Sequence, residues 1–145
     1  MESISRLVTR MNQQGIDAAL VSDPNAICYF TGTRFSPGER LLALLVKKDG
    51  SCKLCINILF PYSGDVPTLW YSDAQDGVVL LAKELSGTLA VDKSFPARFL
   101  LRLQELKAAS GYVNSSAIVD GVRLVKTPDE QEKMRAASRL NDQVM

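Results

Sequence analysis

The spacing of hydrophobic residues along the chain changes from helical to strand-like and back. Near the N-terminus, apolar residues recur at the intervals of one helix face: Ile4, Leu7, Val8 and Met11. Gly15 follows as a typical helix end, and the short apolar run of residues 16–21 predicts a strand. Asp23 and Pro24 suit an N-cap and a first helical position, so a short second helix should extend to Gly32.

A hairpin is indicated in the middle of the chain. Asp49-Gly50 separates two apolar runs, residues 41–47 and 51–58, and this dipeptide is a strong signal for a tight turn between strands. Part of the sheet should therefore be antiparallel. Glycine and proline mark residues 33–40 and 59–68, on either side of the hairpin, as loops.

The second half of the chain predicts alternating strands and helices. The expected elements are a strand at 69–71, a helix at 74–85 capped by Ser72 and Asp73, a strand at 88–91, a helix at 96–109 capped by Ser94, an edge strand at Tyr112 and Val113, and a connector at 116–119. This order predicts an α/β fold, with a mixed β-sheet flanked by helices on both faces. The pattern alone does not choose between a ribonuclease-H-like and a flavodoxin-like sheet.

The last segment has a strong helix start. Thr127 suits the N-cap, Pro128 the first helical position, and Glu130 completes a capping box with Thr127. Apolar residues then continue at helical spacing without a glycine or proline stop before Met145. We therefore expect this chain to be the front part of a longer protein.

Composition excludes several classes of function. The 145 residues suit one domain, and a net charge of +1 without a basic run gives no reason to expect nucleic acid or an anionic membrane as a partner. The longest apolar stretch, residues 41–46, is far too short to span a bilayer. Because the N-terminus also lacks the apolar core of a signal peptide, the expected location is cytoplasmic.

The chain contains no histidine, which removes Ser-His-Asp and Cys-His catalysis and the usual mixed zinc sites. Its three cysteines do not suggest a disulfide framework. Cys52 and Cys55 match C-x-x-C, but on a strand residues three apart point to opposite faces. We interpret them as two unrelated reduced thiols.

No phosphate-binding loop, dinucleotide fingerprint or nucleophile elbow is present. Asp73 and Asp92 both follow predicted strands, as a catalytic carboxylate could. N-cap and turn preferences favour a structural role for each of them. The sequence therefore predicts no self-sufficient catalytic site in this chain.

Three segments together resemble the creatinase/prolidase family of metallopeptidases. They are Asp17–Val21, the run Tyr29-Phe30-Thr31-Gly32 with Asn25 before it, and the junction Arg123–Glu130, where Arg-x-x-Lys-Thr-Pro-x-Glu precedes Met134-Arg135. The resemblance implies a ribonuclease-H-like N-terminal α/β domain over residues 1–126. Residues 127–145 would then begin the first helix of a C-terminal pita-bread catalytic domain that is otherwise missing.

The resemblance implies a homodimeric Xaa-Pro dipeptidase, which hydrolyses the bond preceding proline in short peptides. Two divalent metal ions, Mn, Co or Zn, would lie in the missing domain, so this chain alone is expected to be inactive and to bind no metal. An Xaa-Pro aminopeptidase, creatinase, and a noncatalytic protein-interaction module of peptidase-like fold remain open.

The loop of residues 33–40 is the candidate functional segment of this chain. In the family that it resembles, the N-terminal domain contributes to dimer contacts, and a loop from one subunit can reach the partner's active site. We expect Arg34, Phe35, Glu39 and Arg40 to shape substrate access there, with Phe35 exposed and an arginine able to grip a terminal carboxylate. The alternative is an ordinary solvated connection.

Overall fold

The computed structural model describes residues 2–124 and 128–144, and its core is one six-stranded sheet. The strands are β1 (Ala18–Val21), β2 (Ala43–Lys47), β3 (Cys52–Asn57), β4 (Thr68–Tyr71), β5 (Thr88–Val91) and β6 (Gly111–Asn114). They lie side by side in the order β4-β3-β2-β1-β5-β6. Only β2 is antiparallel to its neighbours; the pairs β1–β5, β3–β4 and β5–β6 are parallel.

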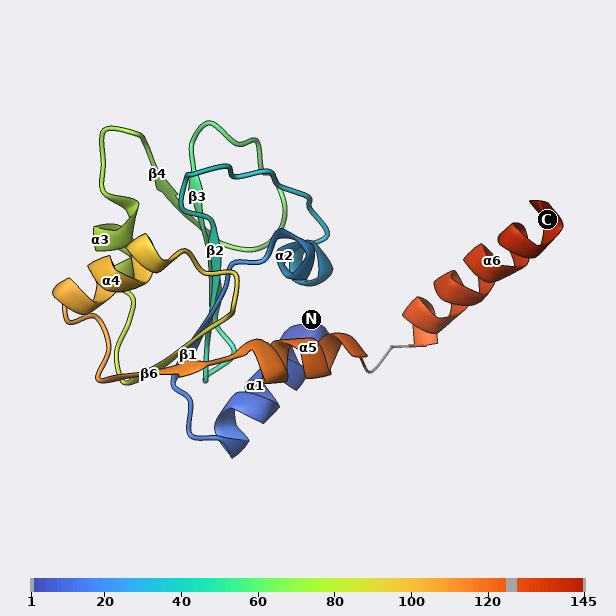
Figure 1. The fold of residues 1–145 in the computed structure, drawn as a ribbon, viewed down its shortest axis with the longest axis horizontal. Coiled ribbons are helices and arrows are strands. Elements are labelled where there is room, and N and C mark those ends of the chain that lie inside the picture. Colours follow the sequence, from blue (N-terminus) through green and yellow to red (C-terminus); the bar gives the residue numbers. More distant parts are fainter. Residues whose placement is uncertain (1, 125–127, 145) are drawn as a thin grey trace.

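Helices cover both faces of this sheet, as the sequence predicted (Figure 1). The helices that do so are α1 (Glu2–Gln13), α2 (Pro24–Thr31), α3 (Gly77–Ala82), α4 (Ala97–Glu105) and α5 (Ser116–Leu124), and a further helix, α6, spans Pro128–Val144. One buried cluster joins α1, α2 and α5 to the sheet, and a second cluster joins α3 and α4 to the opposite face. None of the helices in the described residues is long and apolar enough to cross a membrane.

The local signals near the N-terminus gave the correct structure. The Asp23 carboxylate accepts from the backbone N–H of Asn25, and Pro24 opens α2. Gly32 ends α2 with a φ of 79°, a left-handed conformation that favours glycine. The hairpin also forms where predicted, since Gly50 donates its N–H to the Lys47 carbonyl at 2.9 Å.

The expected caps of α3 and α4 were wrong. α3 begins only at Gly77, and its N-cap is Asp76, whose carboxylate accepts from the Val78 N–H at 3.0 Å. Residues 72–76 form a turn instead, in which the Gln75 side-chain oxygen accepts from the Ser72 N–H at 2.8 Å. α4 begins after Pro96 without any side-chain cap, so Ser94 does not have the predicted role.

The segment expected to be a connector after residue 115 is the helix α5. Ile118, Val119 and Val122 lie at helical spacing and are buried in the cluster that includes α1. Gly121 lies inside α5, at a point where α1 comes close. A β-carbon there would lie 2.8 Å from a guanidinium nitrogen of Arg10.

The C-terminal helix α6 begins at Pro128, as the sequence predicted. Thr127 and the side chain of Glu130 lie outside the described part of the chain, so the capping box stays a prediction. Residues 131–141 are exposed, and Figure 1 shows α6 standing away from the sheet.

Candidate functional site

The strand directions bring several polar residues to one edge of the sheet. β3 and β4 are parallel, so their carboxyl ends meet, and the antiparallel β2 begins at that same edge. Asn57 ends β3, Asp73 follows β4 by two residues, and Arg40 precedes β2. Residues far apart in the sequence therefore converge where the loop 33–40 enters the sheet.

An ordered polar network connects these three residues. Arg40 donates from Nε to Asp73 Oδ1 at 3.0 Å and from Nη2 to Asp73 Oδ2 at 2.8 Å, the two-pronged geometry that favours arginine over lysine. Asn57, which is fully buried, donates from Nδ2 to Asp73 Oδ1 at 2.7 Å. The hydrogen bonds from Arg40 and Asn57 hold the pKa of Asp73 below its ordinary value.

Further contacts hold the end of the loop 33–40. The Tyr71 hydroxyl donates to the Leu41 carbonyl at 2.7 Å, and a guanidinium nitrogen of Arg98 in α4 donates to the Glu39 carbonyl. Burial raises the pKa of Tyr71 to about 12, so this phenol keeps its proton at neutral pH. Three consecutive residues, 39–41, are thus fixed by side chains from β4, α4 and the segment after β4.

The expectation that Phe35 is exposed was wrong. Only 9% of Phe35 is exposed, because its ring packs into the core cluster and lies 6.0 Å from the ring of Tyr62. Arg34 beside it is exposed and forms no ion pair with any other described residue. Glu39 is also exposed. The four predicted access residues therefore divide into an anchor, Phe35, a clamped residue, Arg40, and two exposed charges.

An open groove runs beside this loop. Its walls come from Thr33, from Trp70 of the edge strand β4 and from six residues of the segment that follows β3. These six are Ile58, Phe60, Pro61, Tyr62, Ser63 and Gly64. Ile58 and Trp70 are unusually exposed for large apolar residues, at 58% and 39%. The loop 33–40 thus borders an open groove that mixes polar groups with exposed apolar side chains.

The carboxyl ends of β1 and β5 carry a second polar cluster, which is internally satisfied. Asp92 is buried and accepts from the Ser22 N–H at 2.8 Å, the Asp23 N–H at 3.0 Å and the Ser22 hydroxyl. These bonds tie the start of α2 to the end of β5. Asp92 therefore acts as a structural brace, in agreement with the sequence interpretation.

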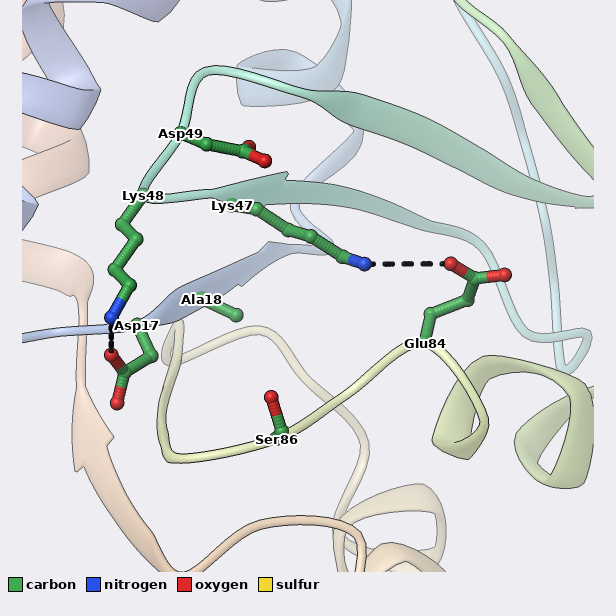
Figure 2. A pocket seen from close by; sticks show the side chains of 7 residues that line it. All are labelled: Asp17, Ala18, Lys47, Lys48, Asp49, Glu84 and Ser86. Atoms are coloured by element: carbon green, nitrogen blue, oxygen red, sulfur yellow. Dashed lines mark hydrogen bonds and ion pairs between the residues drawn. The ribbon is translucent and has the colours of Figure 1, made fainter.

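A cavity of about 160 Å³ lies at the opposite edge, where β2 ends and β1 begins (Figure 2). Its cations are paired: Lys48 Nζ lies 2.7 Å from Asp17 Oδ1, and Lys47 Nζ lies 3.5 Å from Glu84. Asp49 accepts from the N–H and the hydroxyl of Ser51. Because these charged groups already pair with one another, they serve to stabilise the turn between β2 and β3 and its contact with β1.

The described residues contain no cluster of three or more histidine, cysteine, aspartate or glutamate side chains that could hold a metal ion. Cys52 and Cys55 lie on opposite faces of β3, Cys52 against one core cluster and Cys55 within the other. Burial raises the pKa of the Cys55 thiol to about 12, which keeps it protonated and unreactive. The interpretation of two separate reduced thiols is confirmed.

Residues 4–125 match the family model described as the creatinase/prolidase N-terminal domain. The chain belongs to this family. An uncharacterized peptidase of Staphylococcus aureus is 31% identical over 159 aligned residues, which cover 98% of this chain and 42% of the relative. This member of the creatinase/prolidase N-terminal family thus spans less than half the length of the curated relatives that it matches.

Solved structures agree with the family assignment. The N-terminal domain of an X-Pro dipeptidase from Streptococcus pyogenes superposes with a TM-score of 0.70 at 25% identity, covering 81% of this chain and 96% of that one. A dipeptidase from Pyrococcus horikoshii superposes with a TM-score of 0.83 at 24% identity, covering 98% of this chain and 42% of that one. The predicted creatinase/prolidase N-terminal fold is confirmed.

Sequence reasoning found the loop 33–40 but missed two residues that hold it. Asp73 was interpreted as a helix cap, although its carboxylate binds Arg40. Asn57 was not singled out, although a polar residue at the end of an apolar strand is an available signal. Asn57 also stabilises its own turn, accepting from the Leu59 N–H at 2.9 Å.

Proposed function

We propose that this chain is the N-terminal domain of a proline-specific dipeptidase, which hydrolyses the Xaa-Pro bond of short peptides. In this proposal residues 1–126 form the N-terminal domain, and residues 127–145 begin the first helix of a pita-bread catalytic domain. The domain contributes to homodimer contacts, and its loop 33–40 borders the substrate entrance of the partner subunit. The family match over residues 4–125 is the observation that carries the proposal.

The loop geometry supports this role. A segment that shapes a substrate entrance benefits when packing and hydrogen bonds within its own domain hold its geometry. Phe35 anchors one part of the loop in the core, and the contacts of residues 39–41 fix the other. The side chains of Arg34, next to Phe35, and of Glu39, next to Arg40, are exposed.

Arg34 is the arginine best suited to a substrate carboxylate. Two guanidinium nitrogens of Arg40 already donate to Asp73, whereas Arg34 forms no ion pair within the described part of the chain. A free guanidinium beside an entrance can bind a terminal carboxylate through two parallel hydrogen bonds. Recognition by Arg34 would favour dipeptides, whose carboxylate lies close to the scissile bond.

The two metal ions that such a reaction uses do not fit the described residues of this chain, which have no suitable cluster. In this proposal the metal centre lies in the catalytic domain that follows residue 126. The chain contributes binding, orientation and access in this proposal.

The proposal is tested by the hydrolysis of Leu-Pro, measured for the full-length protein and for residues 1–145, with Mn²⁺ and with a chelator. Metal-dependent cleavage by the full-length protein alone is the expected result, and Leu-Ala should be cleaved more slowly. If neither protein cleaves Leu-Pro, creatine or longer Xaa-Pro peptides, the proposal is wrong and a binding function takes its place.

A further inference from the structure

The contacts of Arg40 suggest a role for two residues outside the loop. Arg40 and Asp73 are both largely exposed, and exposed ion pairs contribute little to global stability. Their two-pronged geometry is nevertheless fully formed, and Asn57, buried beneath it, fixes the orientation of the Asp73 carboxylate. This arrangement suits local positioning better than stabilisation of the whole fold.

The contacts are concentrated at one end of the loop. The Arg40 N–H also donates to the Pro37 carbonyl at 3.1 Å, which closes a turn over residues 37–40. Gly38 lies inside that turn with a φ of 60°, so the turn depends on a glycine conformation. Holding the Arg40 side chain therefore fixes the turn and with it the direction of Glu39.

We propose that Asp73, oriented by Asn57, is a positioning residue that clamps Arg40 and sets the shape of the access loop. This inference rests on the proposed function, because it assigns the clamp to substrate access. Asp73 touches neither substrate nor metal in this account. It acts through Arg40, and loss of the clamp loosens residues 36–40 while the sheet and its two cores stay intact.

The test uses the full-length protein with Asp73→Asn, Arg40→Ala and the double variant. Asp73→Asn keeps the size of the side chain but removes the charge that holds Arg40. We expect each variant to raise KM for Leu-Pro about three- to tenfold, with kcat within about twofold of the wild type. The double variant should show no larger effect than either single one, because all three remove the same contact.

Asp65→Asn is the matched control. Asp65 is exposed on the neighbouring loop and forms no ion pair with the described residues, so its variant makes the same charge change without breaking a clamp. Its KM should equal that of the wild type. The melting temperatures of all variants should stay close together, since the lost ion pair is exposed.

Hydrogen exchange of residues 33–40 separates this inference from the proposed function. We expect exchange in the loop to accelerate at least about threefold in Asp73→Asn and Arg40→Ala, and not in Asp65→Asn. Unchanged exchange overturns the clamp, whatever the enzyme assay shows. Faster exchange with unchanged KM overturns its role in access. If the wild type does not cleave Leu-Pro, the proposed function fails, and exchange alone decides the clamp.

Discussion

Individual carboxylates in this domain are used to connect segments. Asp17 is an example, since its two oxygens accept from Lys48 Nζ at 2.7 Å and from the Thr88 N–H at 2.8 Å. Gly87 precedes Thr88 with a φ of 74°, and a β-carbon there would lie 2.2 Å from the Asp17 carboxylate. The glycine is required both by its backbone conformation and by the carboxylate over it.

Asp17 should make the domain less stable in acid. The hydrogen bonds from Lys48 and Thr88 lower the pKa of Asp17 in the folded state below its ordinary value of 3.8. The folded protein thus prefers the ionised form, so this contribution is present above the unfolded pKa and is lost as pH falls through the folded one. Asp17→Asn should lower stability at pH 7 and show a smaller loss of stability between pH 7 and acid.

Denaturant unfolding at several pH values measures this effect, with Asp65→Asn as the control. A variant Asp17→Asn whose stability falls with acid as steeply as that of the wild type would show that Asp17 does not carry the linkage. The pKa of Lys48 gives an independent check. It is raised mainly by the hydrogen bond to Asp17, so it should fall in Asp17→Asn.

The role of a single residue could be predicted where its hydrogen-bond partner is close in sequence, and not where the partner is distant. The capping role of Asp23 depends on Asn25, two residues away, and could be predicted from the sequence. Asp73 depends on Arg40 and Asn57, which are distant in sequence and meet only through the strand order. Phe35 was wrongly predicted to be exposed for the same reason. Its ring packs near Tyr62, which is distant in the sequence.

Helices with a regular apolar stripe or clear end signals were predicted correctly from the sequence. A helix that depends on a tertiary contact for its stability was missed. α1 and α2 have clear stripes and end signals, and both formed as expected. α5 is short and contains a glycine, so periodicity alone did not reveal it. It is stabilised by packing on α1 and by a hydrogen bond from the Arg6 guanidinium to the Val122 carbonyl.

Two leucines of α4 allow a direct test of which face of this helix packs against the sheet. Leu103 is fully buried in the second core cluster, whereas Leu101, two residues earlier, is 59% exposed. Leu103→Ala should cost about 2–5 kcal/mol of stability through lost burial and a residual cavity. Leu101→Ala, the same chemical change on the same helix, should stay within about 0.5 kcal/mol.

Chemical denaturation of the two alanine variants gives this comparison directly. Similar losses of stability for both would mean that α4 does not present the face that the structure assigns to it. A large loss for Leu101→Ala alone would place the opposite side of the helix against the sheet.

At the scale of the whole molecule, the described residues hold no cluster of metal-ligating side chains, and the fold presents the loop 33–40 beside an open groove. The α/β class, the hairpin and the covering of both faces followed from patterning, and the family resemblance identified the sheet as ribonuclease-H-like. The convergence of Asp73 with Arg40 and Asn57 did not follow, because it also depends on β4 pairing parallel with β3.

We propose that this domain supplies the substrate-access loop of a dipeptidase, with Arg34 as its recognition residue. The most direct measurement is the KM and kcat of Leu-Pro hydrolysis for the full-length wild type and for Arg34→Ala, with Asp65→Asn as control. We expect Arg34→Ala to raise KM at least about fivefold with little change in kcat or in melting temperature. An unchanged KM, or a loss confined to kcat, would contradict the account.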